Sequence, residues 1–200
     1  MKKLMIGMFI SVVILAGCGT TRDNQLEIYT NLTTGVKPFK VKLIAEGGQL
    51  KVRERGPNSK CTKFAEKLRT GCFIAEEGEM LELKFTLQHN SEGKKWRFAT
   101  VKICAGTSKP DPDEPSECTL DADQQADFLV VANNKVACMP SDGTVDLTGF
   151  TDQLRVFSVR DFNWHVGDYV YLIQACEEGS TDPDDCVWMD PGGTNNGRGR

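Results

Sequence analysis

Hydrophobic and polar residues alternate along several short stretches of this 200-residue chain. Residues 39–43 (FKVKL) and residues 81–88 (LELKFTLQ) each place an apolar side chain at every second position. A β-strand repeats every two residues, so this alternation is typical of a strand with one buried face and one solvated face. The pattern therefore predicts β-strands at both stretches.

Three further stretches predict strands by their composition. Residues 128–132 (FLVVA) are apolar throughout, which is typical of a strand buried in the middle of a sheet. Residues 154–159 and 169–175 are rich in the β-branched and aromatic residues that favour strands. Turn-forming pairs separate the predicted strands at Gly47-Gly48, Gly56-Pro57, Asn133-Asn134 and Asp142-Gly143.

This succession of short strands predicts a mostly β fold: an antiparallel β-sandwich, immunoglobulin-like or related, over residues 26–190. Two small tandem β-sandwiches are the alternative, because Cys104 and Cys176 each end a strand and open an acidic loop that closes with another cysteine. Residues 167–171 (GDYVY) resemble the tyrosine corner of immunoglobulin-like domains. That resemblance implies a structural hydrogen bond from a tyrosine hydroxyl to nearby backbone.

One helix and one unstructured region complete the predicted architecture. Residues 63–70 (KFAEKLRT) place Phe64 and Leu68 on one face of a short helix, and Gly71 is a suitable helix end. Residues 191–200 are polar and rich in glycine, so we expect a disordered tail there.

The N-terminus carries a short apolar run behind two lysines. Residues 4–15 contain no charge, but a dozen residues are too few to span a bilayer, which takes about 20. A basic start, a short apolar core and small residues after it are typical of a secretory signal. Residues 15–18 (LAGC) resemble a bacterial lipobox. The resemblance implies cleavage before Cys18 and membrane anchoring through acyl chains on that cysteine.

The predicted cleavage divides the N-terminal region and bears on location. Residues 1–17 become the signal peptide and residues 18–25 a lipidated polar tether. Gly19 stands where an Asp commonly retains such lipoproteins at the inner membrane, so the resemblance implies the outer membrane, on its periplasmic or its surface face. Without the two signal lysines, 22 basic and 28 acidic residues remain. The resulting net charge of −6 argues against a nucleic-acid partner.

Seven cysteines remain besides Cys18, and in an exported protein we expect them to oxidise. Seven is odd, so at least one is unpaired or pairs between chains. Cys138, in an apolar segment, is predicted to be the unpaired thiol. Pairing between sequence neighbours predicts disulfides Cys61–Cys72, Cys104–Cys118 and Cys176–Cys186.

The predicted disulfides close loops of opposite charge. Loops 104–118 and 176–186 are acidic and contain proline, whereas residues 51–69 are basic. Calcium binding is one interpretation of the acidic loops, but neither has EF-hand spacing, and we predict no metal. A clamped turn is the favoured interpretation, and recognition through the tips of these rigid loops is the alternative. The candidate interaction residues are Lys60, Lys63, Lys67, Arg69, Asp111, Asp113, Asp182, Asp184 and Asp185.

Motifs of the common hydrolases and nucleotide-binding proteins are missing from the sequence. It contains no HExxH, GxSxG or Walker-A pattern and no CxxC, and its two histidines, His89 and His165, lie far apart in the sequence. We therefore predict no enzymatic activity and no cofactor.

These inferences combine into an expected function. We expect a non-enzymatic outer-membrane lipoprotein that acts as an envelope accessory or assembly factor, contacting the bilayer through its acyl chains and a protein partner through its disulfide-closed loops. The alternative is a module for a glycan or small ligand, which aromatic side chains clustered on an exposed face would favour. A hydrolase ranks third and requires His165 or His89 beside an acidic residue in a cleft.

Overall fold

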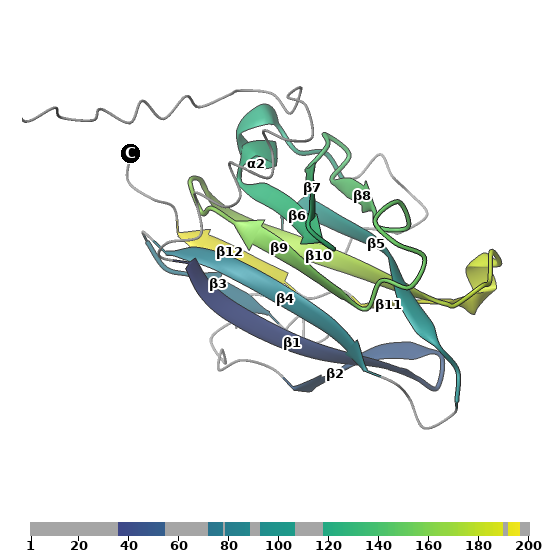
Figure 1. The fold of residues 1–200 in the computed structure, drawn as a ribbon. Coiled ribbons are helices and arrows are strands. Elements are labelled where there is room, and N and C mark those ends of the chain that lie inside the picture. The colour runs from purple at the N-terminus through teal and green to yellow at the C-terminus, as the bar shows by residue number, and fades with distance from the viewer. Residues whose placement is uncertain are drawn as a thin grey trace, which may run out of the picture.

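Two β-sheets face each other in the computed structural model (Figure 1), which describes residues 36–54, 72–77, 79–88, 93–106, 118–189 and 192–196. The order of strands in the first sheet is β2 (Gln49–Glu54), β1 (Val36–Glu46), β4 (Met80–Gln88), β9 (Val156–Asp161), β6 (Phe128–Ala132) and β7 (Lys135–Cys138). The order in the second sheet is β3 (Phe73–Ala75), β12 (Gly192–Asn196), β10 (Val166–Glu177), β5 (Trp96–Ala105) and β8 (Thr144–Asp146), and β11 (Cys186–Met189) also pairs with β10. The predicted β-sandwich is confirmed.

Each sheet takes strands from both halves of the chain. In the first sheet β4 pairs with β9, and in the second sheet β5 pairs with β10, so each sheet joins early strands to late ones. One hydrophobic cluster joins side chains from both sheets. The alternative of two tandem sandwiches is therefore wrong for the described residues, because neither half could complete a sheet alone.

Most of the pairings are antiparallel, as predicted, but two are parallel. β1 runs parallel to β4, and β12 runs parallel to β3. A parallel pair needs a crossover between its strands, and β2 and β3 lie within the crossover from β1 to β4. The sandwich is thus mixed rather than purely antiparallel.

The alternation in the sequence correctly identifies the buried face of the strands. In β4, Leu81, Leu83, Phe85 and Leu87 are buried, while Lys84 is exposed. The ring of Phe157 stacks on Phe85, with ring centroids 5.0 Å apart, and meets Phe98 of the opposite sheet edge-on at 4.7 Å. Burying a side chain of this size contributes about 2–3 kcal/mol, so this aromatic contact between the sheets is a large part of the core.

Three of the four predicted turns also form, at Gly47-Gly48, Asn133-Asn134 and Asp142-Gly143, and the fourth, Gly56-Pro57, lies outside the described residues. Asn133 and Asn134 connect β6 to β7 with φ of 48° and 58°, which is the left-handed conformation that a two-residue hairpin turn requires. Gly143 has φ of 67°, and a side chain there would overlap the carbonyl oxygen of Ile103. That position therefore accepts only glycine.

Two predictions of local structure are not confirmed, and two short elements were not predicted. The expected helix at 63–70 lies outside the described residues. The sequence analysis missed the short helix α2 (Ala122–Ala126) and the 3₁₀ turn η3 (Pro183–Asp185). The prediction of disorder across 191–200 is wrong for residues 192–196, which form β12 between β10 and β3. Backbone pairing needs no apolar side chain, so polarity was a misleading signal there.

No helix within the described ranges is long and apolar enough to cross a membrane.

Candidate functional site

A disulfide closes the acidic loop between β10 and β11. Cys176 and Cys186 face each other in the register of these two strands, and their sulfurs are bonded, as predicted. The turn that they close projects from the right-hand end of the sandwich in Figure 1. We call residues 177–185 the acidic tip.

The predicted pair Cys104–Cys118 also forms, and both residues are buried. The prediction that Cys138 is an unpaired thiol is wrong, because Cys138 is disulfide-bonded. Cys72 is disulfide-bonded too, while its predicted partner Cys61 lies outside the described residues. Sequence proximity finds disulfides that staple a hairpin, but it gives no information on a partner that only the fold brings near.

The two acidic loops begin at opposite ends of one strand pair. β5 and β10 are antiparallel, with Cys104 opposite Val170 and Cys176 opposite Arg97. Their cysteines are therefore separated by about six residues along β10, or roughly 20 Å. Among the described residues, no three His, Cys, Asp or Glu side chains are grouped to hold a metal ion. The acidic residues of the first loop lie outside the described residues, so calcium binding by the two loops together is not tested by the structure.

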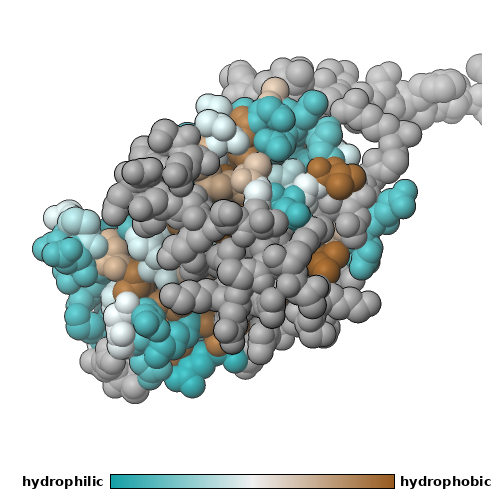
Figure 2. Space-filling model, turned by 180° about the vertical axis from the view of Figure 1, so that it is seen from behind, coloured by the Kyte–Doolittle hydropathy of each residue, from teal (hydrophilic) through white to brown (hydrophobic). Residues whose placement is uncertain are grey.

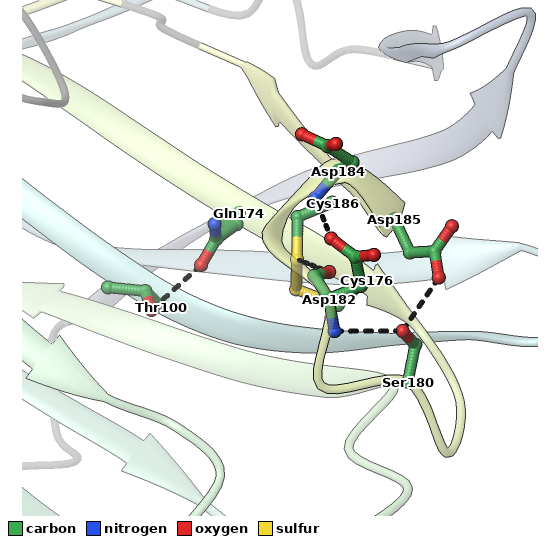
Figure 3. The surroundings of a disulfide bond; sticks show 8 residues. All are labelled: Thr100, Gln174, Cys176, Ser180, Asp182, Asp184, Asp185 and Cys186. Carbon is green, nitrogen blue, oxygen red and sulfur yellow. Dashed lines mark hydrogen bonds between the residues drawn. A yellow bond between two sulfur atoms is a disulfide. The ribbon is translucent and has the colours of Figure 1, made fainter.

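Two carboxylates of the acidic tip, those of Asp182 and Asp185, accept hydrogen bonds within the tip itself (Figure 3). Asp182 caps η3, since its side chain accepts a hydrogen bond from the amide of Asp184 at 2.9 Å. The hydroxyl of Ser180 donates to the carboxylate of Asp185 at 2.7 Å and accepts from the amide of Asp182 at 3.1 Å. These bonds fix the turn, which supports the clamped-turn interpretation.

Two further contacts tie the acidic tip to the strand beside it. Lys94 forms an ion pair with Glu177 at 2.6 Å, and the amide of Glu178 donates to the carbonyl of Lys95 at 2.8 Å. Asp184 is exposed, and in Figure 3 its carboxylate points away from the other labelled residues. The carboxylates of Asp184 and of the partly exposed Glu178 have no hydrogen-bond partner among the described residues, and that of Asp184 is the more accessible to a partner.

The other predicted interaction residues and the lipidation site cannot be placed. They lie outside the described residues: Cys18, Lys60, Lys63, Lys67, Arg69, Asp111 and Asp113.

A second polar cluster, which the sequence analysis did not predict, lies at the other end of β10. Asp127 ends α2, and no part of its side chain is exposed. One carboxylate oxygen accepts from the amide of Trp164 at 3.0 Å. The other oxygen accepts from the amide of His165 at 3.3 Å and lies 3.2 Å from the Nδ1 atom of the same residue. Burial raises the pKa of Asp127, while His165 and the backbone donors oppose that rise.

Asp161 and Asn163 support the same loop from the opposite side. Both are fully buried. The Asp161 carboxylate accepts from the amide of Asn163 at 2.9 Å, and the Asn163 side-chain amide donates to the carbonyls of Glu76 and Glu79 at 2.8 and 3.1 Å. Asn163 has φ of 52°, so a strained backbone conformation is held in place by this network.

The predicted tyrosine corner has a different form. The Tyr169 hydroxyl is buried and has no hydrogen-bond partner among the described residues, while the Tyr171 hydroxyl donates to the carboxylate of Asp161 at 3.4 Å. Burial, followed by the negative charge of nearby aspartates, raises the pKa of Tyr169 and of Tyr171 well above the usual value. Gly167 lies directly against the Tyr169 ring, where a side chain would be crowded.

The pair Asp127–His165 meets the first condition set for a hydrolase, a histidine beside an acidic residue. A carboxylate that holds Nδ1 of an imidazole leaves Nε2 as a base. Among the described residues, no serine, threonine or cysteine side chain is hydrogen-bonded to His165, so the pair lacks a partner nucleophile there. His89 lies outside the described residues.

Comparisons with known proteins add little about function. No family model matches the chain, and no curated protein matches it. A multicopper oxidase from Aquifex aeolicus is 8% identical over 81% of this chain and 30% of its own length, with a TM-score of 0.29. Reduced rusticyanin is 11% identical over 86% of this chain and 97% of its own, with a TM-score of 0.30. At scores this low, neither structure bears on what this chain does.

Proposed function

We propose that this protein is a non-enzymatic lipoprotein of the outer membrane that binds an envelope protein partner through the acidic tip. The lipobox-like residues 15–18 support the anchor. The acidic tip supports the interaction: it projects from the sandwich, and a disulfide and its own hydrogen bonds hold it in one conformation. A partner that binds a preformed turn loses little conformational entropy to ordering it.

The exposed carboxylate of Asp184 is the observation that carries this proposal. The carboxylates of Asp182 and Asp185 accept hydrogen bonds within the turn, and Glu177 is paired with Lys94. A basic side chain of a partner could therefore pair with Asp184 without breaking any bond within the acidic tip. Such a rim charge steers association and adds specificity.

Site-specific photocrosslinking in cells tests this proposal. A photoreactive residue at the exposed position 181, which leaves Asp184 in place, is expected to capture one abundant envelope protein. The same residue at position 152, an exposed aspartate far from the acidic tip in sequence, is the matched control. Asp184→Lys in the chain that carries the photoreactive residue at position 181 should abolish the crosslink through like-charge repulsion. Equal capture at 181 and 152, or no capture at either, would contradict the proposal.

Acylation is tested separately. Cys18→Ala removes the sulfur that carries the lipid, so labelling with a palmitate analogue should disappear and the protein should leave the membrane fraction. Continued labelling of this variant would exclude the lipobox.

A further inference from the structure

The outer face of the second sheet is buried, although it points away from the core. In β10 the side chains of Tyr169, Tyr171 and Ile173 lie in the core between the sheets. Val170 and Leu172 alternate with them and therefore point to the outer face, yet both are 0% exposed. A sheet face in contact with water would expose these two side chains, so another part of this chain covers them.

A small apolar cluster, separate from the core, marks the covered area, and we call it the outer cluster. Its members are Cys72, Cys104, Cys118, Val170 and Leu172, and the partly buried Ile74 and Trp188 pack against it. In Figure 2 the hydrophobic surface of the described residues appears only as small patches between hydrophilic ones. No other described residue contributes an apolar side chain to the outer cluster, so its cover comes from residues outside the described ranges.

Three long stretches lie outside the described ranges, and they differ in position and composition. Residues 55–71 lead directly into Cys72, a member of the outer cluster. Residues 107–117 (TSKPDPDEPSE) also border the cluster, next to Cys118, but apart from proline they contain no apolar side chain. Residues 1–35 lead into β1, which belongs to the other sheet. Residues 55–71 are therefore the best placed to supply the cover.

The helix that the sequence predicts at residues 63–70 has the apolar side that such a cover needs. At about 100° per residue, Phe64, Ala65 and Leu68 fall within an arc of about 100° around the helix, and the charged residues all fall outside that arc. A short helix of this kind gains most of its stability by packing its apolar side against another element. The outer cluster offers an apolar surface directly after the predicted helix ends.

We propose that this predicted helix docks on the outer cluster and adds a third layer to the sandwich. The side chains of Phe64 and Leu68 then pack against Leu172 and its neighbours in the cluster. The polar side of the helix presents Lys63 and Lys67, two of the predicted interaction residues, to solvent. This inference does not depend on the function proposed above.

Nuclear Overhauser contacts in the full chain, held in detergent micelles, test the docking. The probes are the methyl groups of leucine and valine in the unsubstituted protein, so the measurement does not depend on a variant that folds. Leu68 is expected to contact Leu172 or Val170. Contacts of Leu68 only with methyl groups outside the outer cluster, such as those of Leu83 in the core, would overturn the proposal, as would no contact at all.

The same spectra identify another occupant of this face. Contacts of Leu26 or Leu32 with Leu172, in place of contacts from Leu68, would assign the cover to the N-terminal residues and overturn the proposal equally.

A double-mutant cycle measures the same contact by urea titration. Leu68→Ala should lower the folding equilibrium constant about 30-fold, as the truncation of a buried leucine does. When it is combined with Leu172→Ala, the joint effect should differ from the product of the single effects by at least about threefold, because residues in contact are coupled. When it is combined with Leu83→Ala, in the core, the joint effect should equal that product within about twofold.

Lys67→Ala, on the polar side of the predicted helix, is the matched control. It should change the folding equilibrium constant by less than about twofold, as a surface substitution does. Equal effects of Leu68→Ala and Lys67→Ala would overturn the proposal. Coupling of Leu68 to Leu83 in place of Leu172 would overturn it as well.

Discussion

The two ends of β10 use aspartate in opposite ways. At the C-terminal end, the carboxylates of the acidic tip are exposed or partly exposed, and the disulfide between Cys176 and Cys186 holds the two ends of the loop together. At the N-terminal end, Asp127 and Asp161 are fully buried, and the β9–β10 loop depends on their hydrogen bonds. The comparison indicates that the stabilising contribution of an aspartate depends on the water around it, so equal substitutions should have very unequal effects.

The largest expected effect is that of Asp127→Ala. It leaves two backbone amides without their acceptor and Nδ1 of His165 without its partner, and breaking a buried network of this kind costs about 3–5 kcal/mol. The free energy of unfolding from urea titration measures it. Asp152→Ala, at an exposed turn, is the control and should change stability by less than about 0.5 kcal/mol. Similar losses in the free energy of unfolding for both variants would contradict the comparison between buried and exposed aspartates.

Removal of the disulfide at the acidic tip should have the next largest effect. The double variant Cys176→Ser and Cys186→Ser opens a loop of sequence separation 10, for which the chain-entropy model gives about 3 kcal/mol. Urea titration again measures the change. A loss below about 0.5 kcal/mol would show that the hydrogen bonds of Ser180 and Asp182 are sufficient to hold the turn.

Alkaline pH should destabilise the buried end selectively. The folded-state pKa values of Tyr169 and Tyr171 are raised, so the protonated hydroxyls stabilise the fold fully below pH 10, and this contribution is lost as the pH rises and the unfolded chain ionises. At about pH 10.5 the two tyrosines together should lower stability by roughly 1.5 kcal/mol. Absorbance at 295 nm should show these tyrosines ionising only as the protein unfolds. Smooth ionisation of all three tyrosines of the chain in the folded state would contradict their burial.

The smallest effects are expected within the acidic tip. Asp182→Ala removes the cap of η3 and should cost about 1 kcal/mol, whereas Asp182→Asn keeps a capping side chain and should cost only a few tenths. Asp184→Asn should leave stability unchanged and affect partner capture alone. Amide hydrogen exchange of residues 184–186 resolves these differences. A cost for Asp184→Asn as large as that for Asp182→Ala would assign Asp184 a structural role.

Local patterns in the sequence predict the sandwich well and its second polar cluster not at all. The alternation in 81–88, the hairpin at Asn133-Asn134 and the disulfide-closed loops each follow from residues close together in the chain. The helix α2 could also have been predicted, because Asp121 and Gln124 form a capping box that is readable from their spacing. No such signal links Asp127 to His165, 38 residues away, because only the pairing of β6 with β9 brings them together.

The parallel pairing of β12 with β3 has a consequence for how the chain reaches its fold. Residues 193–195 lie beside residues 73–75, so the edge of the second sheet closes only after almost the whole chain is available. Pairings over such long sequence separations form slowly, since the loop between them must first be closed. Until residues 193–195 are available, β3 and one side of β10 lack the strand that lies between them, and an unpaired strand edge of this kind can pair with another chain.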